Sequence, residues 1–183
     1  KADKFFYNSV QYQDGIVNED ITNALTLYNI LQKVNPENPK YCIRSGILYD
    51  KIKKDRQAKG KFFQAIGINQ DNPEPYYYLG EYYYKRELYR KALKNYSQAY
   101  AYGMKSNYDL LYKIGDIYEK LGDTHSALKY LNDAKKQNPH QALEDKIKRI
   151  NNINSSNNEY YSNSKIKTNT TFCMGVHNKR TFF

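Results

Sequence analysis

The residue types that most often carry catalytic or metal chemistry are sparse in this sequence. The three histidines, His125, His140 and His177, have no acid or nucleophile partner at the spacing of a known catalytic motif. Cys173 and His177 form an isolated C-x3-H pair, whereas a tetrahedral zinc site needs further ligands that are not nearby. A glycine-rich phosphate loop and the G-x-S-x-G and H-E-x-x-H motifs are also absent. We therefore expect no enzyme activity, no metal site and no cofactor.

The formal net charge of +10, from 29 Lys and Arg against 19 Asp and Glu, permits attraction to nucleic acid or to an anionic membrane. Basic residues are, however, interleaved with acidic ones, as in 51–56 and 144–149. This pattern is typical of solvated helix faces and argues against a nucleic-acid groove. No run of apolar residues is long enough to span a membrane.

The cellular compartment stays open at this level. Two cysteines do not make a disulfide framework, and Cys42 falls on an apolar stripe where a thiol behaves as a small hydrophobe. The chain begins at Lys1 rather than Met, which is typical of a trimmed or mature form, so that a removed signal or anchor stays possible. The Asn-, Lys- and Tyr-rich usage fits a bacterial envelope or secretion-associated scaffold, and it is also what codon bias in an AT-rich genome produces.

Five residue columns recur along the chain at a period of 34 to 35 residues. They consist of a glycine, a tyrosine three residues later, an alanine, a large apolar or aromatic residue, and a second alanine. The three copies are Gly46, Tyr49, Ala58, Phe62 and Ala65; Gly80, Tyr83, Ala92, Tyr96 and Ala99; and Gly115, Tyr118, Ala127, Leu131 and Ala134. Small residues suit the points where two antiparallel helices cross closely, and large ones fill the space beside the crossing.

This pattern resembles the tetratricopeptide repeat, W-x2-L-G-x2-Y followed by A-x3-F and then P. The first segments read Cys42-x2-Ser45-Gly46-x2-Tyr49, Tyr76-x2-Leu79-Gly80-x2-Tyr83 and Leu111-x2-Ile114-Gly115-x2-Tyr118. The tryptophan is missing from every copy and Ser45 replaces the leucine of the first, but these columns require bulk rather than indole chemistry. The resemblance implies an all-α, right-handed superhelical solenoid of antiparallel helix pairs, with about four repeats and a C-terminal capping helix.

We expect a degenerate N-terminal repeat at 1–38, in which Tyr12 takes the place of the glycine, and repeats at 39–72, 73–107 and 108–140. A capping helix at 141–153 and a flexible tail at 154–183 follow. Helices are predicted at 3–13, 20–34, 40–53, 55–69, 74–86, 88–102, 108–121, 124–137 and 141–153. The apolar end of the tail, 171–183, is either an interaction peptide or a mobile end with incidental phenylalanines.

In the family that the chain resembles, the first helix of each repeat lines a concave groove that binds peptides or helices. The glycine columns place one stripe of each first helix toward that groove. It consists of Ile43, Ile47 and Asp50, then Tyr77, Glu81 and Tyr84, then Tyr112, Asp116 and Glu119. An aromatic and mildly acidic stripe suits a partner segment with apolar anchors and Lys or Arg. It does not suit the carboxylate clamp of the chaperone-binding members. Tyr76 and Tyr83 are assigned to packing.

The sequence therefore favours a non-catalytic protein–protein interaction scaffold that binds a partner segment in its groove and supports the assembly of a larger complex. Two alternatives stay open. One is a basic accessory protein that binds nucleic acid or an anionic membrane through its outer surface. The other is a regulatory module of a longer enzyme.

Overall fold

The computed structural model describes residues 1–11, 13–153 and 155, and every regular element in these ranges is a helix. The elements are α1 (Ala2–Val10), α2 (Glu19–Val34), α3 (Pro39–Lys51), α4 (Asp55–Ile68), α5 (Pro73–Tyr84), α6 (Tyr89–Ala101), α7 (Tyr108–Lys120) and α8 (Thr124–Gln137). A C-terminal helix follows at 141–153. The ranges predicted from 20–34 onward agree with these bounds to within two residues at each end.

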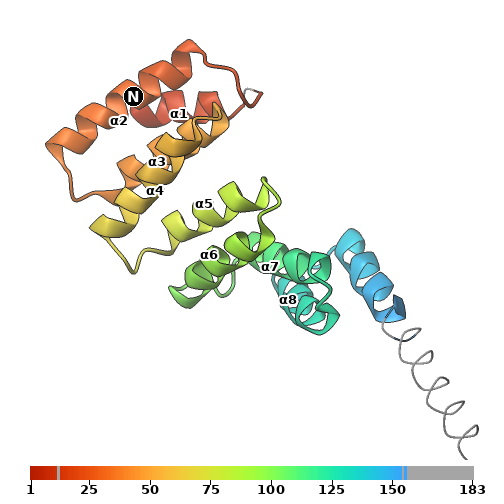
Figure 1. Cartoon of the computed structure of the whole chain (residues 1–183). Helices are drawn as coiled ribbons and strands as arrows, with labels where there is room; N and C mark the ends of the chain where they lie inside the picture. Colours follow the sequence, from red (N-terminus) through yellow and green to blue (C-terminus); the bar gives the residue numbers. More distant parts are fainter. Residues whose placement is uncertain (12, 154, 156–183) are drawn as a thin grey trace, which may run out of the picture.

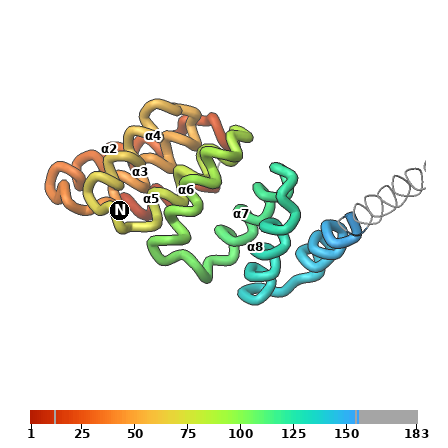
Figure 2. Tube along the Cα trace, turned by 60° about the horizontal axis from the view of Figure 1, so that its bottom comes forward, coloured from red at the N-terminus to blue at the C-terminus, as the bar shows by residue number. Residues whose placement is uncertain are grey.

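Successive helices pair into hairpins, and the hairpins follow one another from the N-terminal pair to the C-terminal helix (Figures 1 and 2). We call α1, α3, α5 and α7 the first helices and α2, α4, α6 and α8 the second helices. The C-terminal helix occupies the position of a further first helix after α8. The predicted solenoid of helix pairs with a capping helix is confirmed.

Asparagine side chains begin three of the four first helices. The Asn38, Asn72 and Asn107 side chains accept hydrogen bonds from the backbone N–H groups of Lys40, Glu74 and Leu110. In α3 and α5 a proline directly follows this cap and occupies the first helical turn, where its missing N–H has no intrahelical partner to lose. The pairs Asn38-Pro39 and Asn72-Pro73 are therefore helix starts, whereas Asn35 and Asn138, each also followed by a proline, end α2 and α8.

The turns inside the last three hairpins share one backbone conformation. Lys53, Glu87 and Gly122 each have a positive φ, of 59°, 57° and 83°. The next N–H in each turn, that of Lys54, Leu88 or Asp123, donates back to the carbonyl of the recurring tyrosine, at 2.8, 3.0 and 2.9 Å. This is the Schellman ending of a helix. The tyrosine column thus also marks where each first helix closes.

The glycine column is explained by direct contact with the column of large residues. A Cβ on Gly46 would lie 2.6 Å from the Phe62 ring, and one on Gly115 would lie 2.7 Å from the Leu131 side chain. Gly80 stands against the Tyr96 ring in the same way. The recurring alanines beside these contacts are fully buried. Close approach of the two helices of a hairpin therefore requires glycine at this position.

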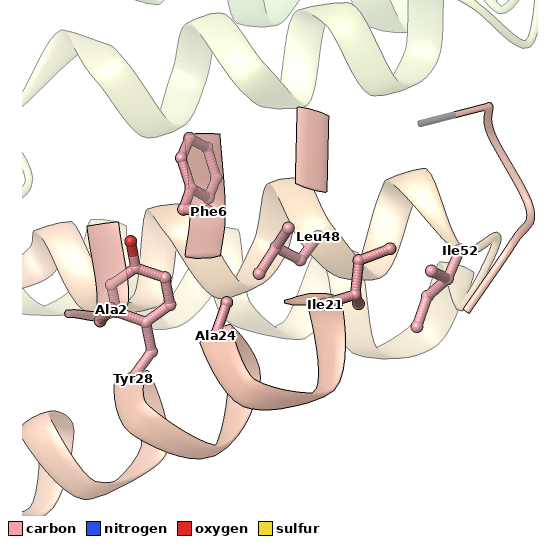
Figure 3. Packing of buried hydrophobic residues seen from close by; sticks show 7 residues of the cluster. All are labelled: Ala2, Phe6, Ile21, Ala24, Tyr28, Leu48 and Ile52. Atoms are coloured by element: carbon pink, nitrogen blue, oxygen red, sulfur yellow. The ribbon is translucent and has the colours of Figure 1, made fainter. Parts of the chain in front are cut away.

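The N-terminal hairpin departs from the repeat. Helix α1 ends at Val10, three residues before the predicted end at 13, and Gly15 at φ +91° lies in the connection to α2. Tyr12, expected in place of the glycine, lies outside the described residues, as does the tail apart from Ser155. The hairpin is held by a cluster of side chains from α1, α2 and α3 (Figure 3), in which Phe6 packs edge-on against Tyr28.

Candidate partner-binding surface

The predicted stripe runs along α3, α5 and α7, and its residues differ in how much surface they keep. Ile47, Tyr77, Tyr84 and Tyr112 are half-buried. Ile43 is 1% exposed and packs in the core with Cys42 and Ala65. Because a side chain at that depth offers no surface to a partner, Ile43 is a core residue rather than part of a surface stripe.

Between α5 and α7, the stripe residues contact each other and a lysine. The Tyr84 hydroxyl donates to Asp116 Oδ2 at 2.6 Å. The Lys113 ammonium lies 4.0 Å from the centroid of the Tyr84 ring and 3.6 Å from Glu81 Oε2. A cation between a ring face and a carboxylate is attracted by both. These contacts join consecutive first helices.

The same arrangement recurs between α7 and the C-terminal helix. Lys146 forms ion pairs with Asp116 and, at 2.9 Å, with Glu119, and its ammonium lies 5.0 Å from the centroid of the Tyr112 ring. Arg149 binds the other oxygen of Glu119 at 2.6 Å. The side chains of Lys146 and Asp116 are only 13% and 11% exposed. The C-terminal helix is therefore attached to the last hairpin by buried charge as well as by Leu143, Ile147 and Ile150.

Burial and pairing act in opposite directions on the pKa values of these two groups. Burial raises the pKa of Asp116, but the hydrogen bonds from Lys146 and Tyr84 outweigh it, so that the pKa lies below its usual value. Burial lowers the pKa of Lys146, but the hydrogen bonds to Asp116 and Glu119 outweigh it, so that the pKa lies above its usual value. Both groups are held in their charged forms.

Asp50 makes the equivalent contact between α3 and the end of α5. Its carboxylate accepts from Arg86 at 2.9 Å and from Lys85 at 3.1 Å. Arg86 also reaches Asp55 at 2.5 Å, and its guanidinium lies 3.7 Å from the centroid of the Tyr82 ring. Asp50 thus belongs to the contact between two hairpins.

We name these interactions the ion-pair ladder: Asp50–Arg86, Glu81–Lys113, Asp116–Lys146 and Glu119–Arg149. Each acid of the predicted stripe is paired with a cation of the following hairpin or of the C-terminal helix. The expected acidic surface is therefore largely neutralised from within. Sequence reasoning found the acids and missed their partners, although each cation lies about one repeat further along the chain than its acid.

The histidines and cysteines are the remaining candidates for catalysis or metal binding. His125 and His140 are exposed, and His140 Nδ1 accepts from the Leu143 N–H at the start of the C-terminal helix, while Nε2 lies 2.5 Å from the Tyr108 hydroxyl. Cys42 is a buried free thiol whose pKa is raised by burial. Cys173 and His177 lie outside the described residues. No group of His, Cys, Asp and Glu within the described ranges could hold a metal ion. None of the helices described there is long and apolar enough to cross a membrane.

The chain resembles known proteins in sequence, through one family model, and in structure. The model of the tetratricopeptide repeat family matches residues 109–140, which span α7 and α8. No curated protein matches the sequence. Among solved structures, a MamA protein is 18% identical, covers 90% of each chain and has a TM-score of 0.64. TTC0263 of Thermus thermophilus is 17% identical over 71% of this chain and 72% of its own, with a TM-score of 0.58.

A third structure, YrrB, is described as a tetratricopeptide protein with an unusual peptide-binding site. It is 26% identical, covers 61% of this chain and 57% of its own, and has a TM-score of 0.57. The matched repeat coincides with the last of the three copies found by spacing, and the two helix pairs directly before it have the same close glycine contact and the same buried alanines. The chain thus matches the tetratricopeptide repeat family at 109–140 and shares the fold of solved tetratricopeptide repeat structures.

Proposed function

We propose that the chain is a non-catalytic scaffold that docks a segment of a partner protein on the surface of its first helices and so supports the assembly of a larger complex. The observation that carries the proposal is the row of half-buried aromatic and aliphatic side chains on consecutive first helices, Ile47, Tyr77 and Tyr112. Tyrosines of this kind supply contact area with little loss of conformational entropy on binding. The peptide-binding site named for YrrB is in keeping with this use of the fold.

The ion-pair ladder changes the expected chemistry of the partner. A basic segment gains little from carboxylates that are already bonded to Arg86, Lys113, Lys146 and Arg149, because it would have to displace those cations. Apolar anchors of the partner should therefore supply most of the affinity. Any basic residues on it should mainly set its orientation.

The test uses peptides selected from a displayed random library on the immobilised full chain, with affinities then measured by fluorescence anisotropy. A Tyr77→Ala/Tyr112→Ala variant removes two anchors, and we expect its affinity to fall about tenfold or more. Tyr84 is left intact, because its hydroxyl and ring hold Asp116 and Lys113. A Tyr77→Phe/Tyr112→Phe variant keeps both rings and serves as the matched control.

Equal binding by the alanine variant and the wild type, with an unchanged circular dichroism spectrum, would show that the peptides do not bind on the first-helix surface. Tight binding by the phenylalanine control together with weak binding by the alanine variant supports the proposal. Loss of binding in both variants would point to the hydroxyls and against anchoring by apolar area.

A further inference from the structure

A second surface, on the side of the second helices, carries an aromatic hollow of about 550 Å³ between α4, α5 and α6. We call it the aromatic hollow, and its apolar and aromatic lining consists of Phe63, Ile66, Tyr76, Tyr83 and Tyr102. Tyr76 and Tyr102 stack on each other with ring centroids 5.3 Å apart. Phe63 is 56% exposed. A concave surface of this volume with a mainly apolar and aromatic lining and a few polar groups is the usual form of a binding site.

The repeat provides an equivalent hollow one period earlier, with a different lining. This polar hollow, of about 490 Å³, is lined by Asn29, Gln32, Lys33, Pro36, Lys61, Gln64 and Ile68. Asn29 stands 34 residues before Phe63, Gln32 before Ile66 and Ile68 before Tyr102. Helix α4 separates the two hollows, since Phe63 faces one and Lys61 the other. The backbone geometry of the repeat thus makes both hollows, and the side chains decide that one is aromatic and the other polar.

All charged residues that line the two hollows are lysines. Lys91 and Lys94 line the aromatic hollow, and Lys33 and Lys61 line the polar one, without any acidic residue among the described linings. Neither Lys91 nor Lys94 forms an ion pair with a described residue, and Lys91 lies 5.8 Å from the centroid of the Tyr83 ring. The ladder lysines Lys113 and Lys146, by contrast, are each paired with a carboxylate.

We propose that the aromatic hollow is a second docking site, which takes a protein segment carrying an aromatic or large apolar side chain flanked by Asp or Glu. The side chain enters between Phe63 and the stacked Tyr76 and Tyr102, and its acidic neighbours meet Lys91 and Lys94. Complementary charge fixes the register, and the buried ring supplies the affinity.

The same lysines and rings raise the question of a nucleic acid, whose bases stack on aromatic side chains along a basic track. The lining argues against it. The hollow one period earlier is polar rather than aromatic, so a strand that runs toward it would find no second stacking platform there. Tyr76 and Tyr102 stack on each other and do not present free faces as a row. The chain's own 171–183 segment is also a poor occupant, because it contains Lys179 and Arg180 and no acid.

The test measures the anisotropy of a fluorescein-labelled peptide, Asp-Asp-Phe-Asp-Asp, on the full chain. Phe63→Asn gives the aromatic hollow the residue of its polar equivalent, and we expect the affinity to fall about tenfold. Lys91→Gln/Lys94→Gln should weaken binding by a similar factor and flatten its dependence on salt. Asn29→Phe, the reverse exchange in the polar hollow, and Tyr77→Ala/Tyr112→Ala, on the first-helix surface, should leave the affinity unchanged.

No measurable binding of the peptide, or equal binding by Phe63→Asn, overturns the proposal. Tighter binding of an oligothymidylate with a steep loss on added salt overturns it in favour of nucleic acid. Loss of peptide binding in Tyr77→Ala/Tyr112→Ala with none in Phe63→Asn assigns the peptide to the first-helix surface, and so supports the proposed function while it removes the second site.

Discussion

The first-helix surface and the second-helix hollows use the same residue types in opposite ways. On the first-helix surface, Lys113 and Lys146 lie against tyrosine rings and carboxylates, and they join one hairpin to the next. At the aromatic hollow, Lys91 and Lys94 stand beside tyrosines without an acid. Tyrosine and lysine therefore hold the solenoid together where acids accompany them, and they stay available for a partner where acids do not.

The comparison also explains how a chain of net charge +10 can carry a neutral groove. The ladder acids Asp50, Glu81, Asp116 and Glu119 are each paired with a cation, so they add little uncompensated negative charge to this surface. Lys91 and Lys94, by contrast, line the aromatic hollow without an acid among its lining residues.

The largest expected effect comes from breaking the ladder at its most buried pair. Asp116→Ala leaves the Tyr84 hydroxyl without an acceptor and Lys146 with Glu119 alone, and it should lower the free energy of unfolding by about 3 kcal/mol. Denaturant unfolding followed by circular dichroism measures it. Glu144→Ala is the matched control, because the Lys135–Glu144 pair also joins α8 to the C-terminal helix but is 41% and 33% exposed, and its loss should have a much smaller effect on the free energy of unfolding. Similar costs for the two variants would contradict a buried ladder.

A smaller effect should appear on acidification. Because the folded-state pKa of Asp116 lies below its ordinary value of about 4, its contribution to stability is present above that pH and is lost as the pH falls through the folded-state value. Other carboxylates with lowered pKa values, such as Asp3 and Asp55, share the acid sensitivity of the whole chain. The difference in unfolding free energy between the wild type and Asp116→Asn should therefore narrow below about pH 4. A difference that stays constant with pH would show that the carboxylate charge is not what stabilises the contact.

Much of the fold follows from the sequence, because each repeat column has a local steric cause. Glycine is required where the Phe62, Tyr96 or Leu131 side chain fills the crossing, and Asn-Pro begins α3 and α5. The end of α1 could not be predicted from the sequence, since the N-terminal hairpin lacks the glycine contact and depends on a cluster with α3 instead. Lys53 and Glu87 have a left-handed backbone conformation although neither is glycine, and no residue type at these positions predicts it.

The candidate sites could be predicted less well from the sequence. Helix phase placed Glu81, Tyr84, Tyr112 and Asp116 on one stripe, but the depth of Ile43 depends on how Tyr78 and Ile68 of the neighbouring helices cover it. The pairing of acids with Lys113 and Lys146 depends on the stacking angle between hairpins. Tyr76 and Tyr83 were assigned to packing alone, and they also line the aromatic hollow. Phe63, which belongs to no repeat column, carried no signal of its own.

The central claim is that lysines on the first-helix surface are engaged and those at the aromatic hollow are free. Acylation of the native chain by a small amine-reactive reagent, followed site by site by mass spectrometry, tests it directly. The neutral amine is the reacting form, so the raised pKa and burial of Lys146 and the pairing of Lys113 should make both slow. Lys91 and Lys94 should be modified well before them, whereas equal rates at all four lysines would contradict the account.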